Sequence, residues 1–280
     1  MALIKIISKI LKKFLPYSWY LQLQKIHIKI INSNKYKHYD LSGDLNYNEN
    51  LFKSLNFDIE KIKSQLNSLN FQYHDSGLSW HYHLFVGLKN YFGNKKINIL
   101  EIGTHNGNFA NFISKIYDES HIVTIDLDES DNQFINTYDR DKKEELDEFL
   151  KLRNKNLNRK NIDFIKLNSL NIKKYFNEKK FDLIWVDGDH FNPQVTIDII
   201  NSLDLLNNDG ILCTDDVIMD NLFKNHKYVS NNGFFTLKHL EDNGLIKNYY
   251  LIKRIRIKNA IYKKYVSVST FKDNYKFIVK

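Results

Sequence analysis

The sequence contains one cysteine, Cys213, among 280 residues. A lone cysteine cannot form an internal disulfide, and it cannot supply the thiolates of a cysteine-based zinc site. Because Cys213 lies in a short apolar run that predicts a strand, we expect its thiol to be buried and to take no part in chemistry. Disulfide frameworks and cysteine-based zinc sites are therefore excluded.

Acidic residues are missing from positions 1–39, where eight lysines occur. The chain has 41 basic and 33 acidic residues, so the part after residue 39 is electrically balanced. The basic character belongs to the amino terminus and does not form the broad basic face of a nucleic-acid-binding protein. We expect no nucleic-acid partner.

The amino terminus also lacks a long apolar run, because lysines interrupt it too often for a signal peptide or a membrane span. Residues 3–15 (LIKIISKILKKFL) place apolar side chains on one helical face and lysines largely on the other. Such a helix binds an anionic membrane surface or packs on protein, and both interpretations stay open. We expect a cytoplasmic protein, with this segment at the inner membrane face or on a protein surface such as a second copy of the chain.

Hydrophobic residues make up 42% of the chain, enough for a sizeable core, and their spacing alternates between strand and helix periods. The sequence predicts strands at 97–102, 121–125, 162–167, 183–186 and 211–213, and helices at 58–69, 78–92, 142–152 and 234–243, with others after residues 108 and 192. Residues 36–56 are polar without a clear period and are predicted to be a linker or loop. Consecutive strands are predicted at 249–257, 265–270 and 275–279.

This order of elements predicts an α/β fold with a Rossmann-like, doubly wound, mostly parallel sheet. Consecutive strands without an intervening helix predict an antiparallel hairpin at the carboxyl terminus. The helices that precede the sheet form an N-terminal helical extension. We therefore divide the chain into an extension, residues 1–93, and a sheet domain, residues 94–280.

Two features allow more than one interpretation. Residues 129–160 form a long insertion, which is either a lid on the substrate side or a solvated surface helix. His74, His81 and His83 are close in sequence, but positions 81 and 83 point to different sides of a helix. We expect surface or pocket-lining histidines there, and no metal site.

Two strand ends in the first half of the sheet have the features of a ligand site. The strand with Glu101 runs into Gly103 and Gly107, which let a backbone approach a ligand closely, and a helix begins directly after them. The next strand ends at Asp126, where an acid can accept hydrogen bonds from ribose hydroxyls. The G-x-x-x-G spacing differs from the dinucleotide G-x-G-x-x-G, which disfavours an NAD-linked oxidoreductase.

Two later strand ends are crowded with acids. Asp187-Gly188-Asp189-His190 follows one buried strand, and Asp215-Asp216 follows the next. Carboxylates that converge at one edge repel one another unless a cation lies among them, and oxygen ligands suit Mg²⁺. The alternatives are that Asp215 and Asp216 cap the following segment and that Asp187 orients a cofactor.

In order, ILEIGTHNG, VTID and LNS resemble motifs of class I S-adenosylmethionine-dependent methyltransferases, over residues 96–280. The resemblance implies S-adenosyl-L-methionine as cofactor and a methyltransferase domain over 94–280. It places Glu101 and Gly103 near the methionine part and Asp126 at the ribose. Asn168 and Ser169 would flank the adenine, although the family more often has an acid at position 168. The implied cofactor-binding set also includes Thr104, Gly107 and Asp187.

DGDH followed by DD is similar to the metal-dependent O-methyltransferases of the macrocin and novobiocin sugar type and, more distantly, of the catechol type. This resemblance implies Asp187, Asp215 and Asp216 as ligands of Mg²⁺ or another divalent cation. Asp189 matches the base of the sugar enzymes. His190 stands where the catechol type has a lysine, so these two residues compete as the catalytic base.

The sequence thus predicts an S-adenosylmethionine-dependent O-methyltransferase, assisted by a divalent metal, that acts on a hydroxyl of a sugar or glycoside such as a surface polysaccharide. The partner is then a small-molecule or glycan acceptor. One alternative is a phenol or catechol O-methyltransferase. The other is a non-catalytic scaffold that binds the cofactor and docks through its basic N-terminal helix.

Overall fold

The computed structural model describes residues 41–69, 79–137, 140–221, 223–225, 229–257 and 261–273. The chain divides into two compact units, one of residues 48–256 and 261–280 and the other of residues 1–47 and 257–260. The first unit contains the sheet and is the one described below. The helix predicted at 3–15, the strand predicted at 275–279 and His74 lie outside the described residues. The boundary predicted at residues 93–94 stays a prediction.

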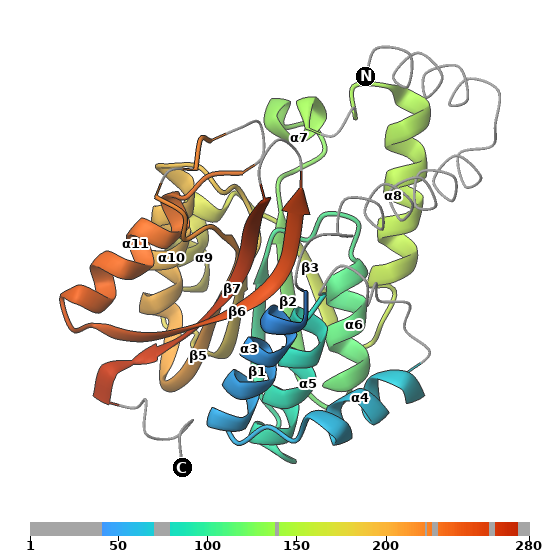
Figure 1. Ribbon diagram of the computed structural model, residues 1–280. Helices are drawn as coiled ribbons and strands as arrows, with labels where there is room; N and C mark the ends of the chain where they lie inside the picture. Colours follow the sequence, from blue (N-terminus) through green and yellow to red (C-terminus); the bar gives the residue numbers. More distant parts are fainter. Residues whose placement is uncertain are drawn as a thin grey trace, which may run out of the picture. The chain divides into compact units, whose positions relative to one another are not determined.

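A seven-stranded sheet has the order β3-β2-β1-β4-β5-β7-β6. Strands β1 to β5 run parallel, and β7 is antiparallel to β5 (Figure 1). The α/β fold and the C-terminal hairpin are therefore confirmed. The strands are β1 (Asn98–Ile102), β2 (His121–Asp126), β3 (Ile162–Lys166), β4 (Phe181–Val186), β5 (Leu206–Val217), β6 (Ile246–Ile257) and β7 (Ile261–Phe271).

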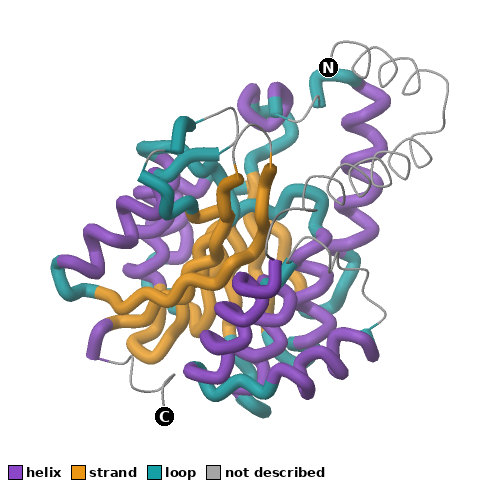
Figure 2. The backbone as a smooth tube through the Cα atoms, viewed as in Figure 1, coloured by secondary structure: helices purple, strands orange, loops and turns teal. Residues whose placement is uncertain are grey.

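Helices cover both faces of the sheet (Figure 2). Helices α9, α10 and α11 lie on one face, and α5, α6 and α8 lie on the other, with α4 against α5 (Figure 1). None of the described helices is long and apolar enough to cross a membrane. The helices are α3 (Leu41–Ser54), α4 (Ile59–Ser68), α5 (His81–Phe92), α6 (Asn108–Ile116), α7 (Asn132–Asn136), α8 (Lys143–Leu157), α9 (Ile172–Phe176), α10 (Gln194–Leu205) and α11 (Asn232–Asp242), with a 3₁₀ turn, η3 (Ser169–Asn171).

The central strand β4 is buried along its whole length. Ile184 and Val186 belong to the same apolar cluster as Val195 of α10. Trp185 lies between them in sequence and faces the other layer, where its ring is 5.3 Å from that of Phe85. This two-sided burial explains why the strand reads as a continuous apolar run with no polar alternation.

The prediction of a loop over residues 36–56 is wrong, because α3 occupies most of this range. The inner face of α3 includes a polar residue, Asn48, which is fully buried with Phe52 one turn later. The Asn48 side chain donates to the carbonyl of Ile252 and accepts from its N–H, both at 2.9 Å. A buried polar residue with a distant partner interrupts the apolar period, so the helix was not visible in the pattern.

His81 and His83 both have relative exposures below 10% and are interior residues of α5. The ring of His83 stacks on Trp80 with centroids 4.8 Å apart, and the ring of His81 lies 5.4 Å from that of Phe109. Of the two expected positions, surface or pocket-lining, the surface position is therefore wrong, and the two histidines do point into different surroundings. Both serve as aromatic core residues.

Gly103 should tolerate no side chain. Its φ is +100°, and an added Cβ would lie 2.2 Å from the carbonyl oxygen of Asp187. Gly93 also has a positive φ, +60°, but has open space around the Cβ position. We expect Gly93→Ala to cost about 1 kcal/mol of unfolding free energy from backbone strain, and Gly103→Ala at least about 3 kcal/mol because a backbone clash is added. Urea unfolding measures both values, and equal losses would contradict the close approach.

Candidate active site

The carboxyl ends of the five parallel strands meet at one edge of the sheet. Ile102 of β1 is in register with Ile125 of β2 and Val186 of β4, and Val186 is in register with Thr214 of β5. The segments that follow these positions therefore start side by side, where ligands bind in open α/β sheets. This edge carries the predicted site residues: Glu101, Gly103, Thr104, Gly107, Asp126, Asn168, Ser169, Asp187, Asp189, His190, Asp215 and Asp216.

The loop after β1 is held by backbone hydrogen bonds to both neighbouring strands. The N–H groups of Gly103 and Thr104 donate to the carbonyl of Ile125, at 2.9 and 3.2 Å. The N–H of Asp187 donates to the carbonyl of Ile102 at 2.8 Å, which brings the β4 loop against the β1 loop. Gly107, with φ +70°, turns the chain into α6. The loop is thus a fixed backbone segment at the amino end of a helix.

Glu101 lies beneath this loop, with a relative exposure of 1%. The hydroxyl of Thr124 donates to its carboxyl group, and the hydroxyls of Thr104 and Thr124 are 2.6 Å apart. Burial raises the pKa of Glu101 to about 8, although the Thr124 hydrogen bond acts in the opposite direction. The protonated carboxyl group is therefore the favoured form at neutral pH, and it ties the loop to β1 and β2.

Asp126 ends β2 and is partly exposed. One carboxylate oxygen accepts from the N–H of His105 and the other from the N–H of Leu127, both at 2.8 Å. Burial raises the pKa of Asp126, and these two backbone hydrogen bonds oppose the rise. Each oxygen has a second lone pair, so the oriented carboxylate can still accept hydrogen bonds from vicinal hydroxyls of a ligand.

Helix α8 braces the glycine loop, which sequence reasoning did not foresee. The side-chain amide of Asn156 donates to the carbonyl of Asn106 at 2.8 Å. The Leu157 side chain fills the space beside Gly107, where an added Cβ would lie 2.9 Å from it. The carboxyl end of the 129–160 insertion is therefore a packed support of the loop. The lid interpretation stays a prediction for the rest of the insertion.

The end of β3 supplies the next polar group. The side-chain oxygen of Asn168 accepts from the N–H of Leu170 at 3.0 Å and starts the 3₁₀ turn. The hydroxyl of Ser169 accepts from the amide of Gln194 at 2.6 Å, and the same amide donates to Asp198 at 2.8 Å. Burial raises the pKa of Asp198 to about 6. Sequence reasoning missed Asp198; the available signal was an acid on the core-facing side of an apolar helix.

A β-bulge shapes the acidic corner after β5. Thr214 pairs with Ser267 and Val217 with Tyr265, so β5 has one more residue than β7 in this interval. Asp216 lies in this interval and has a φ of +50°, in the left-handed region. Successive strand residues normally point to opposite faces, but a bulge re-aims them. Asp215 and Asp216 can therefore meet the same partner.

That partner is Lys253 of β6. Its ammonium group donates to Asp215 and lies 3.3 Å from Oδ1 of Asp216, while Lys264 of β7 donates to Oδ2 of Asp216. The lysine side chains are 9% and 7% exposed, and that of Asp215 is 1% exposed. Lysines are almost never buried unless they are paired, and these two are paired with the predicted metal ligands.

The charges of this corner depend on one another. Burial alone would raise the pKa of Asp216, but Lys253, His190 and Lys264 hold it well below its usual range. Burial lowers the pKa of Lys264, and Asp216 opposes that effect. Asp216 therefore stays ionised because the ammonium groups of Lys253 and Lys264 lie against it.

His190 and Asp189, the two candidate bases, have different surroundings. Nε2 of His190 lies 3.8 Å from Oδ1 of Asp187 and 3.6 Å from Oδ2 of Asp216. Burial lowers the pKa of His190, an effect that the two β5 aspartates oppose, which favours its neutral form. Asp189 is exposed, and its carboxylate accepts from the N–H of Phe191 at 3.0 Å in a local turn. The structure thus brings His190, and not Asp189, to the acidic corner.

The predicted metal ligands do not fit a divalent cation as they are arranged. Three of the four carboxylate oxygens of Asp215 and Asp216 already lie against lysine ammonium groups. At about 4 Å near a protein surface, a divalent ion and an ammonium group would repel each other by roughly 8 kcal/mol. Within the described part of the chain, no group of three or more His, Cys, Asp or Glu side chains is placed to hold a metal ion.

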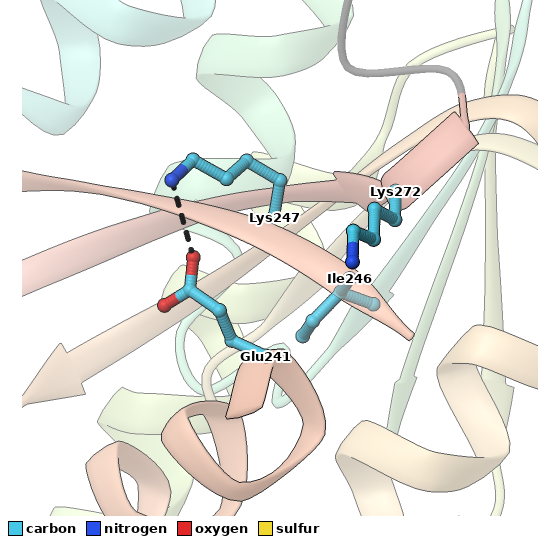
Figure 3. Close-up of a pocket in the computed structure, with 4 residues that line it drawn as sticks. All are labelled: Glu241, Ile246, Lys247 and Lys272. Atoms are coloured by element: carbon cyan, nitrogen blue, oxygen red, sulfur yellow. Dashed lines mark ion pairs between the residues drawn. The ribbon is translucent and has the colours of Figure 1, made fainter. Parts of the chain in front are cut away.

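A cavity at the other end of the strands, away from the carboxyl ends of β1 to β5, is unrelated to this site. It has a volume of about 390 Å³ and is lined by Glu241, Ile246, Lys247 and Lys272 (Figure 3). Glu241 and Lys247 form an ion pair at 3.7 Å across it. Because β7 is antiparallel to β5, the carboxyl end of β7 lies away from Asp215 and Asp216. None of the predicted site residues lines this cavity.

A known protein family matches the part of the chain that contains the candidate active site. Residues 100–217 match the family whose description is "Methyltransferase domain". No curated protein matches the chain at a significant level. The matched range is less than half of the chain and runs from β1 to the acidic end of β5.

Solved structures with a similar fold include several O-methyltransferases. A candidate caffeoyl-CoA O-methyltransferase from Staphylococcus aureus is 21% identical, with a TM-score of 0.47, and the match covers 81% of this chain and 100% of that one. TomG from Streptomyces achromogenes, an O-methyltransferase of tomaymycin synthesis solved with S-adenosylmethionine, is 12% identical with a TM-score of 0.47, covering 75% and 96%. Likenesses at this level carry no information on substrate or cofactor.

Glu101 should make the stability of the protein depend on pH. Its pKa is about 8 in the folded protein against an ordinary value of 4.5, so between these pH values the folded state holds a proton that the unfolded state has lost. The contribution of Glu101 to the free energy of unfolding is complete below pH 4.5. It falls as pH rises from 4.5 through the folded pKa of about 8, and above that pH it is lost. Between pH 5 and 8, wild type should lose roughly 1 kcal/mol per pH unit relative to Glu101→Gln, which cannot ionise.

Urea unfolding at several pH values measures this difference. Glu119→Gln is a suitable control, because Glu119 is exposed and lies 3.4 Å from Lys96 at the surface. The control should follow the wild-type pH dependence. Parallel curves for wild type and Glu101→Gln would show that Glu101 is not protonated in the folded protein.

Proposed function

Starting from the methyltransferase domain at residues 100–217, we propose that the chain is an S-adenosylmethionine-dependent O-methyltransferase. We propose a hydroxyl group of a sugar or glycoside as the acceptor. The observation that carries the proposal is the single strand edge that holds a fixed glycine loop, an oriented Asp126 and a histidine beside carboxylates. A cofactor and an acceptor could meet between these groups.

The residues of this edge fit the cofactor. S-adenosylmethionine, when bound, supplies a methyl group on a positively charged sulfur. Gly103 lets the backbone of Asp187 lie directly against the loop after β1, and the amino end of α6 follows the loop with backbone N–H groups. Asp126 would accept the ribose hydroxyls, and Asn168 and Ser169 would border the adenine. Glu101 would act from below, by holding the loop through Thr124 and Thr104.

We assign the proton acceptor to His190. Its side chain is 16% exposed and lies beside Asp187 and Asp216, so it is accessible from the strand edge. It would take the proton of the acceptor hydroxyl while that oxygen bonds to the methyl carbon, the bond from that carbon to sulfur breaks, and S-adenosylhomocysteine leaves. Asp189 has the better match to the sugar-methylating enzymes, but its carboxylate is engaged in the turn to Phe191. The proposal includes no Mg²⁺, because lysines occupy the carboxylates that would bind it.

The sugar class rests on the resemblance of DGDH and DD to sugar-methylating enzymes. Abundant aromatic residues are also compatible with a phenolic acceptor. A panel of glycosides and phenols, assayed with labelled S-adenosylmethionine, separates the two. Methylation of phenols alone would overturn the sugar assignment and leave the proposed O-methyl transfer intact.

Cofactor binding should depend on Asp126. We expect Asp126→Asn to weaken the affinity for S-adenosylhomocysteine about tenfold or more, because a charged acceptor of hydrogen bonds becomes a neutral one. Isothermal titration calorimetry measures this. Asp163→Asn is the control, since Asp163 lies on β3 with a 64% exposed side chain paired to His121. If wild type binds no S-adenosylhomocysteine, the proposed function is wrong.

Methyl transfer should depend on His190 more than on Asp189. We expect His190→Asn to lower the turnover rate about 100-fold or more while the affinity for S-adenosylhomocysteine stays the same, as for the loss of a general base. Asp189→Asn should lower it only a few-fold. The assay uses whichever acceptor of the panel is methylated. A larger loss in Asp189→Asn than in His190→Asn would assign the base to Asp189.

A further inference from the structure

We propose that Lys253 and Lys264 take the place of a divalent cation at the corner of Asp187, Asp215 and Asp216. The proposal rests on the proposed function, because it concerns the same site and the metal that the sequence resemblance implies there. Its content is a metal-independent site, in which two ammonium groups supply the positive charge that the two β5 carboxylates require.

The first argument is where the ammonium groups lie. Lys253 contacts both β5 aspartates, and Lys264 contacts the second of them, so the two lysines together touch three carboxylate oxygens. A metal ion would need those same oxygens as ligands. Two positive charges therefore already stand against Asp215 and Asp216, and a further cation would have to displace them.

The second argument is that both lysines are held by the fold. Lys253 follows Ile252, whose backbone N–H and carbonyl are bonded by the side chain of Asn48 as a neighbouring strand would bond them. Lys264 lies on β7, next to Tyr265, which is in register with Val217 of β5. Flexible surface lysines contribute little, whereas lysines with buried stems on strands are fixed in place.

The third argument is how the remaining groups are distributed. Asp187 and His190 stay on the accessible side of the corner, with side chains 34% and 16% exposed. Asp215 is almost completely buried behind them. The lysines therefore act as positioning residues: they neutralise Asp215 and Asp216, and they leave Asp187, the most exposed of the three aspartates, to face the acceptor together with His190.

Manganese is a suitable probe, because its binding can be followed by electron paramagnetic resonance without any assay of activity. We expect the wild-type full chain to bind Mn²⁺ only weakly, at millimolar concentration, and its affinity for S-adenosylhomocysteine to be unchanged by EDTA. The double variant Lys253→Met/Lys264→Met removes both ammonium groups and should gain affinity for Mn²⁺ by about tenfold or more. Lys247→Met, at the opposite edge of the sheet, should behave as wild type.

Two results would overturn the proposal. One is tight Mn²⁺ binding by wild type that is lost in Asp215→Asn. The other is a folded double variant, checked by circular dichroism, that gains no affinity for Mn²⁺. If the double variant does not fold, the wild-type titration with Asp215→Asn decides alone. Calorimetry with S-adenosylhomocysteine on the same samples tests the proposed function separately. It measures cofactor binding, which we assign to the glycine loop and Asp126 and not to the lysine corner.

Discussion

An ionised carboxylate cannot be buried without compensation, and this constraint shapes the whole strand edge. The chain meets it in a different way at each strand. Glu101 is compensated by protonation, Asp126 by two backbone N–H groups and Asp216 by two lysines. Each solution fixes a different property of the edge: a neutral anchor under the loop, a charged acceptor of hydrogen bonds, and a balanced ionic corner.

The pairing of the β5 aspartates with lysines explains the role of the C-terminal hairpin. In the order β5-β7-β6, the strand antiparallel to β5 brings its beginning to the carboxyl end of β5. Lys264 therefore arrives beside Asp216 from β7, and Lys253 from β6 completes the corner. The hairpin thus does more than cover the sheet edge, because it carries the counter-charges of the site. The bulge in β5 is the matching feature, since it lets consecutive aspartates share one lysine.

The parts that were visible in the sequence are those determined by local pattern. The five parallel strands, the glycine loop and the acids at strand ends all follow from short runs of residues. The lysine partners were not visible, because Lys253 and Lys264 are 38 and 48 residues away from the aspartates they contact. In sequence they look like solvent-facing positions of edge strands. Asn48 was hidden for the same reason, since its partner Ile252 is 204 residues away.

A cluster of carboxylates therefore predicts that positive charge is present, but it does not predict which kind. A metal ion and a pair of ammonium groups satisfy the same electrostatic requirement. The DGDH and DD segments are compatible with either. What separates them is whether buried basic side chains on the neighbouring strands reach the cluster, and here Lys253 of β6 and Lys264 of β7 do. The counter-ion of an acidic strand edge has to be sought in the neighbouring strands as well as in the acidic motif itself.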